Sequence, residues 1–168
     1  RRKERLKNEA AERARVAQRQ QAAASEAHRR WEGASESGES PYLARKGVKA
    51  HGCRFEPGGV LLVPMRDAGG ALWNLQAILP AARADGADKP FLAGARVKGC
   101  MHWLGDPTRR KWLLVAEGYA TAASLHEASG LPVAAAFNAG NLEEVVRVVR
   151  KRHPSAWILV CGDDDAGT

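Results

Sequence analysis

The chain has 168 residues, 45% of them hydrophobic, which is enough for one globular core and a small second lobe. The formal net charge of +7 makes a polyanionic partner plausible, although an ordinary solvated basic surface would give the same charge. No apolar run has the length of a membrane span. The three cysteines lack the spacing of a zinc site or a disulfide framework, which suits a reducing cytoplasm.

The N-terminal segment, residues 1–32, is rich in Ala, Glu, Arg, Lys and Gln and contains neither Gly nor Pro, which predicts a helix. It has few large apolar side chains, so we expect an exposed basic helix that serves as a connector. A basic helix can also lie along a phosphate backbone. Residues 33–41 are rich in Gly, Ser and Glu and predict a linker, with a domain boundary near Pro41.

Region 42–110 consists of short apolar runs separated by turns. Residues 60–65 and 71–78 flank an Asp-Ala-Gly-Gly turn and predict a β-hairpin. Residues 89–92 and 100–104 are candidates for edge strands of the same sheet. We therefore predict a small α+β lobe with an antiparallel sheet.

Region 111–168 has an α/β pattern, in which three apolar strands alternate with two helices. These elements are predicted at residues 112–116, 119–129, 131–137, 141–152 and 157–161. Strands that are apolar throughout predict a parallel sheet covered by helices on both faces. The carboxyl ends of the three strands should then meet at one edge of the sheet.

Acidic residues and glycines follow these strand ends. Glu117 precedes a glycine after the first strand, and Asp163, Asp164 and Asp165 come directly after Gly162 at the end of the third. Clustered carboxylates repel one another unless a cation lies between them, and oxygen ligands without His or Cys suit Mg²⁺ or Mn²⁺. In an extended segment Asp163 and Asp165 point the same way, so we expect Glu117, Asp163 and Asp165 to be the catalytic, metal-binding residues. A solvated loop or a helix cap is the structural alternative for the aspartate run.

The sequence around these carboxylates resembles the Toprim family. Residues 113–122 resemble the first Toprim motif, a hydrophobic strand that ends in Glu-Gly, and residues 158–165 resemble the second, a strand that ends in Asp-x-Asp. The resemblance is closest to the Toprim modules of phage- and plasmid-encoded, DnaG-like primases, and it extends over residues 42–168. The third aspartate is a departure from the motif, and it leaves open whether Asp164 or Asp165 is the second ligand.

This resemblance implies an α/β fold: a Toprim (Rossmann-like) parallel sheet, truncated at the C-terminus and preceded by the small α+β lobe and the N-terminal basic helix. It implies a primase, a nucleotidyltransferase that synthesises RNA primers from ribonucleoside triphosphates on single-stranded DNA, in plasmid or phage replication or transfer. Mg²⁺ would be held by Glu117, Asp163 and Asp165. The candidates for binding nucleotide or template are Lys89, Arg96, Lys98, Asn138, Arg109 and Arg110, with His102 as a further candidate in the small lobe.

Two alternatives remain open from the sequence. One is a Toprim nuclease, which uses similar carboxylates to cut phosphodiesters. The other is a non-catalytic Toprim module that binds nucleic acid within a relaxase or helicase fusion, and a helicase or relaxase is also a possible partner of a primase. Because the first residue is Arg1 and the last residues are polar, we expect an internal fragment. Since the sequence stops at its own predicted metal site, we expect little or no activity from it by itself.

Overall fold

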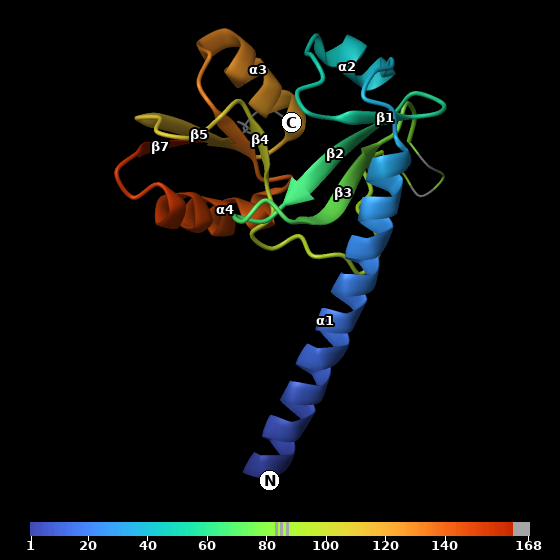
Figure 1. Cartoon of the computed structure of the whole chain (residues 1–168), viewed down its shortest axis with the longest axis vertical. Helices are drawn as coiled ribbons and strands as arrows, with labels where there is room; N and C mark the ends of the chain where they lie inside the picture. The colour runs from blue at the N-terminus through green and yellow to red at the C-terminus, as the bar shows by residue number, and fades with distance from the viewer. Residues whose placement is uncertain (83, 85, 87, 163–168) are drawn as a thin grey trace.

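The structure is a computed structural model that describes residues 1–162 except residues 83, 85 and 87. A body of two lobes carries a long helix, α1 (Arg2–Gly33), which projects from it with the N-terminus at its far end (Figure 1). None of the described helices is both long and apolar enough to cross a membrane.

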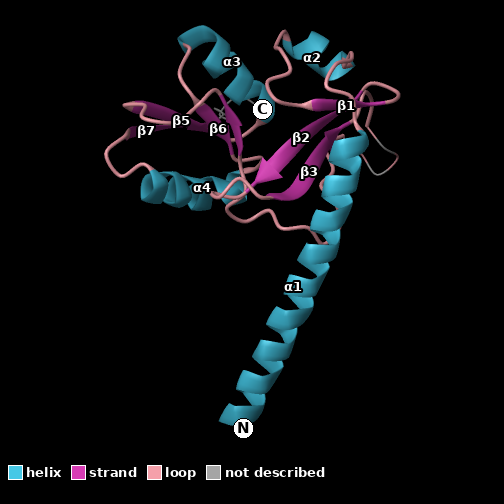
Figure 2. Ribbon diagram, in the orientation of Figure 1, coloured by secondary structure: helices cyan, strands magenta, loops and turns pink. Residues whose placement is uncertain are grey.

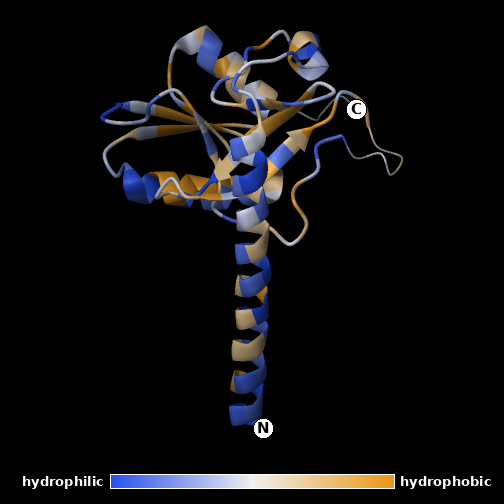
Figure 3. Ribbon diagram, turned by 45° about the vertical axis from the view of Figure 1, so that its right-hand side comes forward, coloured by the Kyte–Doolittle hydropathy of each residue, from blue (hydrophilic) through white to orange (hydrophobic). Residues whose placement is uncertain are grey.

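Helix α1 is polar and exposed over most of its length, as the composition predicts (Figure 3). Its C-terminal end differs from the prediction, because Ala23, Ala24 and Ala27 are buried and pack toward strand β3 of the small lobe. Arg30 also forms two hydrogen bonds to the Glu56 carboxylate, at 2.9 and 2.6 Å. Only the N-terminal part of α1 is therefore the exposed connector that the sequence predicts. The buried face near its C-terminal end was missed because it consists of alanines and not of the large apolar residues that usually mark such a face.

The small lobe is a three-stranded antiparallel sheet in the order β1-β2-β3. Its elements are α2 (Pro41–Lys46), β1 (Arg54–Glu56), β2 (Val60–Arg66) and β3 (Leu72–Ile78). The predicted hairpin is present as β2 and β3. Asp67 shapes its turn by accepting hydrogen bonds from the backbone N–H groups of Gly69 and Ala71, at 2.9 and 3.1 Å.

The two segments predicted as edge strands of this sheet behave differently. Residues 89–92 make only an isolated bridge to β3. Strand β4 (His102–Leu104) does form, but it joins the other sheet, antiparallel to β6 (Val133–Ala135). Met101, just before β4, makes an isolated bridge to Arg66 and so links the two sheets. A short apolar run shows that a strand is favourable but not which distant strand it will pair with.

The second lobe, which we call the α/β lobe, contains a four-stranded sheet in the order β4-β6-β5-β7, in which β5, β6 and β7 are parallel. Its further elements are β5 (Trp112–Ala116), α3 (Tyr119–Ser129), α4 (Ala139–Arg152) and β7 (Trp157–Cys161). Helix α3 lies over one face of the sheet and α4 over the other (Figure 2). The predicted α/β fold with a parallel sheet is confirmed.

The helices cover this sheet unevenly. Apart from Trp112, β5 and β6 are buried, whereas β7 leaves Trp157, Leu159 and Val160 exposed. In the described part of the chain β7 is an edge strand, and α3 and α4 lie mainly over the middle of the sheet. The prediction that helices cover both faces therefore holds for β5 and β6 and is wrong for β7.

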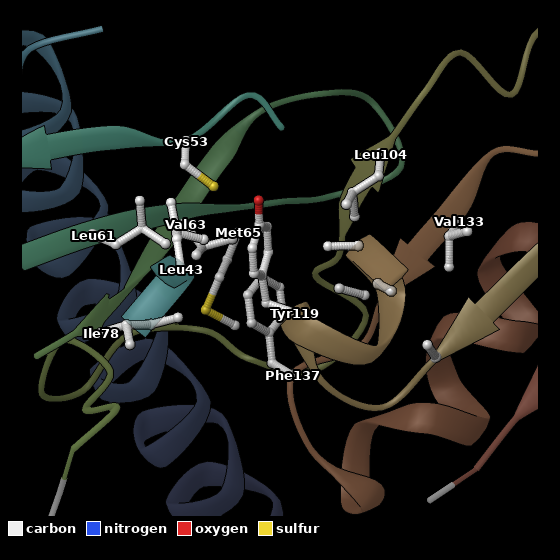
Figure 4. Packing of buried hydrophobic residues seen from close by; sticks show 14 of the residues in the cluster. Leu43, Cys53, Leu61, Val63, Met65, Ile78, Leu104, Tyr119, Val133 and Phe137 are labelled. Carbon is white, nitrogen blue, oxygen red and sulfur yellow. The ribbon is translucent and has the colours of Figure 1, made fainter. Parts of the chain in front are cut away.

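One apolar core joins the two lobes. Met65 and Ile78 of the small lobe pack in the same cluster as Tyr119 and Phe137 of the α/β lobe (Figure 4). Protein cores are close-packed, so side chains that interlock across a boundary hold the two sides in a fixed relation. The lobes thus form one unit, and the grooves between them have walls set by packing.

Candidate active site

The carboxyl ends of the parallel strands lie at one edge of the sheet. Ala116, the last residue of β5, is in register with Ala135 of β6 and with Cys161 of β7. The next residues on two neighbouring strands are Glu117 and Gly162. The predicted carboxylate ligands Asp163 and Asp165, together with Asp164, lie outside the described residues, so the structure shows the approach to this cluster and not the cluster itself.

Glu117 is partly buried, and its carboxylate forms no hydrogen bond or ion pair with another described residue. Gly118 follows as the N-cap of α3. A partly buried carboxylate without a partner is unfavourable unless a cation or water compensates it. Among the described residues no group of three or more His, Cys, Asp or Glu can hold a metal, so Glu117 contributes only part of a ligand set. Its donor chemistry fits a hard divalent cation shared with carboxylates at the neighbouring strand end.

The turn between β6 and α4 has a strained backbone. Phe137 has a φ of 75°, in the left-handed region that residues with a Cβ rarely adopt. Its ring is buried and meets the ring of Phe91 edge-on, with centroids 6.3 Å apart. Asn138 then caps α4, since its Oδ1 accepts a hydrogen bond from the Asn141 backbone N–H at 2.9 Å. Helix α4 therefore begins before Asn141, where the sequence had placed its start.

Asn141 has a role that sequence reasoning missed. Its side chain is buried and makes three hydrogen bonds: Oδ1 accepts from the Gly99 backbone N–H at 2.8 Å, and Nδ2 donates to the carbonyls of Cys100 and Ala136, both at 2.9 Å. These bonds tie the start of α4 to the end of β6 and to the segment that enters β4. The sequence signal, a polar residue near a helix start, is the same as that of an ordinary cap.

Tyr119 fixes the other side of the site. It is buried, and its hydroxyl donates to the Lys49 carbonyl at 2.9 Å and accepts from the His51 backbone N–H at 2.8 Å. Burial raises the pKa of Tyr119, which agrees with a packing role and not with that of a nucleophile. On the same helix, the Glu127 carboxylate accepts from the Lys49 backbone N–H and from His51 Nε2, at 2.8 and 2.7 Å. The loop that carries Lys49 and His51 is thereby attached to α3 near Glu117.

Two of the predicted nucleotide- or template-binding residues lie at the carboxyl edge. Lys98 and Asn138 line an open groove of about 560 Å³ with the first turns of α4. Lys98 is largely exposed, and its Nζ lies 3.7 Å from Glu144 Oε2. Of the two, Lys98 is paired with Glu144 but exposed enough for its charge to reach a ligand, whereas Asn138 Oδ1 is already engaged as a cap.

Two other predicted cations have partners within the small lobe. The Arg96 guanidinium lies 5.1 Å from the ring centroid of Trp73, and its Nη1 is 3.9 Å from Asp67 Oδ2. The Lys89 Nζ lies 5.4 Å from the ring centroid of Tyr42. Cation–π contacts of this kind hold a charged head near a surface without neutralising it. A role for Arg96 or Lys89 in binding stays a prediction.

The remaining candidates are not near Glu117. Arg109 and Arg110 precede β5, so they lie at the amino edge of the sheet, opposite the carboxyl edge. The further candidate His102 is 6% exposed, and its Nε2–H donates to the His51 carbonyl at 2.6 Å. Burial lowers the pKa of His102 to about 4, so the ring is neutral near pH 7. His102 lies on β4 and lines a pocket between the lobes, so a role for it in binding nucleotide or template stays a prediction.

Residues 112–168 match the family model of the Toprim domain. The part of the chain that contains the parallel sheet and Glu117 thus belongs to the Toprim family, and the predicted resemblance is confirmed.

The relatives of the chain include DNA primases. Over 131 residues the chain is 35% identical to the DNA primase TraC of Escherichia coli, an alignment that covers 75% of this chain and 12% of that protein. A second DNA primase TraC from Escherichia coli matches at 35% over 131 residues and is covered to 9%. The chain therefore spans only a small part of the length of these relatives. The RNA polymerase domain of Mycobacterium tuberculosis primase DnaG is also similar, with a TM-score of 0.44 and 19% identity over 79% of this chain and 53% of that one.

Proposed function

We propose that this chain is part of the catalytic region of a DNA primase, a nucleotidyltransferase that synthesises RNA primers on single-stranded DNA. The Toprim match and the similarity to two proteins named DNA primase support this proposal. The observation that carries it is the strand register, which brings Glu117 next to the strand end that leads into Asp163, Asp164 and Asp165. Carboxylates gathered at one edge of the sheet would hold the divalent cation that phosphoryl transfer uses.

The implied cofactor is Mg²⁺ or Mn²⁺, with Glu117, Asp163 and Asp165 as its protein ligands. When bound, such a cation neutralises the charge that develops on the nucleotide phosphates during transfer. The described residues supply the position of Glu117. Glu117 is held at the start of α3, which Tyr119 anchors to the small lobe, and Asn141 fixes the turn on the other side.

The substrates would be ribonucleoside triphosphates and a single-stranded template. Lys98 is the predicted cation best placed to meet triphosphate oxygens, because it is exposed at the groove beside α4. Asn138 would support that groove from its wall, and Arg96 and Lys89 would contact the DNA template along the small lobe. We further propose a plasmid or phage replication context, a helicase or relaxase as partner, and a reducing cytoplasm, which suits the unpaired Cys53, Cys100 and Cys161.

Primer synthesis by the full-length protein tests this proposal. We expect Glu117→Gln and Asp163→Asn each to lower the incorporation of labelled ribonucleotides on single-stranded DNA by roughly 10²-fold or more, because each removes charge from the metal site. The matched control is Glu12→Gln, an exposed carboxylate on the projecting part of α1, which should retain full synthesis.

The other outcomes point to the alternatives. Near-normal synthesis by Glu117→Gln would refute the site. Mg²⁺-dependent cutting of DNA without synthesis would indicate a Toprim nuclease. A protein that shows no Mg²⁺-dependent change of any kind would be a non-catalytic module.

A further inference from the structure

A second group of cations lies at the amino edge of the parallel strands in the α/β lobe. Arg109, Arg110 and Lys111 precede β5, and Arg152 ends α4. These four residues, which we call the amino-edge cations, line a pocket of about 340 Å³ together with the segment 153–156. The five residues of β5 separate this edge from Glu117, roughly 16 Å at 3.3 Å per residue.

The amino-edge cations are exposed and unpaired. None of the four forms an ion pair with a carboxylate in the described part of the chain. The acidic residue nearest in sequence is Asp106, whose pKa is lowered first by hydrogen bonding with Thr108 and only slightly by Arg110. Charges of one sign gathered in a hollow raise the local concentration of a polyanion.

The backbone of this basic loop is also unusual. Arg109 has a φ of 55°, in the left-handed region. For a residue with a Cβ this conformation costs roughly 1 kcal/mol or more, and such residues are common at functional sites. The conformation turns the chain just before β5, so that three consecutive basic side chains project from one short segment.

A pocket with aromatic walls adjoins the cations. It has a volume of about 440 Å³, lies between the two lobes, and shares Arg152 and His153 with the amino-edge pocket. Trp103 and Trp31 contribute to its walls. Trp103 meets the His153 ring edge-on, with centroids 6.1 Å apart. The Arg66 guanidinium lies 5.8 Å from the ring centroid of Trp31.

We infer that the amino-edge cations and the adjoining inter-lobe pocket bind single-stranded nucleic acid, at a surface separate from the catalytic edge. A single strand offers phosphates to the cations and an unstacked base to Trp103 and Trp31, and such mixed basic and aromatic grooves suit it. A duplex keeps its bases stacked, and an acidic protein has no bases. The inference does not depend on catalysis, because a nuclease or a binding module would use the same surface.

Fluorescence anisotropy with the full-length protein tests this inference. The probe is a labelled oligothymidylate of about 20 nucleotides, long enough to span both pockets, in EDTA so that no metal ion contributes. The variant is Arg109→Gln/Arg110→Gln/Lys111→Gln. We expect its affinity to fall about tenfold or more near 0.1 M salt, and the slope of log K against log salt to become shallower by about 2, since each lost phosphate contact removes about 0.7.

The matched control is Arg2→Gln/Lys3→Gln/Lys7→Gln, which removes the same charge from the projecting part of α1. An equal loss of affinity in this control would show a general charge effect and overturn the inference. Unchanged affinity in the amino-edge variant would overturn it as well. Equal affinity for a duplex of the same length would contradict the preference for a single strand.

Two further variants test the two pockets separately. Trp103→Leu should weaken oligothymidylate binding without changing the salt slope, because stacking releases no counterions. Ser155→Glu places a carboxylate among the amino-edge cations at an exposed position, so the fold is not at risk. It should weaken binding severalfold. If Ser155→Glu binds like the wild type, the amino-edge pocket is not the binding site.

Discussion

His102 is an imidazole that the fold keeps neutral. It lies on β4 in contact with the core that joins the lobes, and its Nε2–H is bonded to the His51 carbonyl. Burial lowers its pKa to about 4 from an ordinary value near 6.5. The unfolded chain therefore binds a proton as the pH falls through 6.5, whereas the folded chain does so only near 4.

This difference predicts how stability depends on pH. Between pH 6.5 and pH 4 the unfolded state holds more protons at this position, so the free energy of unfolding decreases as the pH falls, by up to roughly 3 kcal/mol. Urea unfolding at pH 7 and pH 4.5 measures it. His102→Gln should be less stable at pH 7 but should lose less stability on acidification. Equal losses in the two proteins would contradict the assignment.

At the scale of elements, the local patterns were predictable and the long-range pairings were not. Helix α3 and strand β7 have the predicted bounds, since an apolar run or a helix with Gly130 as its C-cap is encoded in neighbouring residues. The sheet that β4 joins and the burial of Ala27 depend on partners far along the chain. The prediction of the site residues was limited in the same way, by contacts between segments that are distant in the sequence.

The position of Glu117 at the carboxyl edge was predictable, because a strand end in a parallel sheet is a local feature with a known direction. The same rule places Arg109 and Arg110, which precede that strand, at the opposite edge, and so argues against grouping them with Glu117. Asn141 was not predictable, because its partners Gly99 and Cys100 come from another segment. In the sequence, a polar residue that joins three elements cannot be distinguished from a helix cap, because its bonding partners are known only from the packed structure.

Asn141 should therefore matter more to stability than the true cap beside it. Asn141→Ala leaves the Gly99 N–H and the carbonyls of Cys100 and Ala136 without their partner, and we expect a loss of roughly 3 kcal/mol. The control Asn138→Ala removes only the cap and should cost about 1 kcal/mol. Chemical denaturation at pH 7 compares the two. Equal losses would mean that the bonds to the segment before β4 contribute little.

For the whole molecule, the shared core has a consequence for metal binding. Side chains of both lobes lie in one cluster, so the lobes should unfold together in a single transition. A cation that binds only the folded state stabilises it by RT ln(1 + [L]/Kd), about 1.4 kcal/mol at ten times Kd. A metal ion at the carboxyl edge should therefore stabilise the small lobe as well as the α/β lobe.

We expect Mg²⁺ to raise the melting temperature of the chain by several degrees. Far-UV circular dichroism and tryptophan fluorescence, to which Trp31 of α1 and Trp73 of the small lobe contribute, should report the same midpoint. Glu117→Gln should lose most of this shift, and Glu12→Gln should keep it, because only the first change touches the proposed ligands. Two separate transitions, of which Mg²⁺ moves only one, would show that the shared core does not couple the lobes. An equal shift in Glu117→Gln would instead remove Glu117 from the metal site, while coincident midpoints would still establish that the two lobes unfold as one.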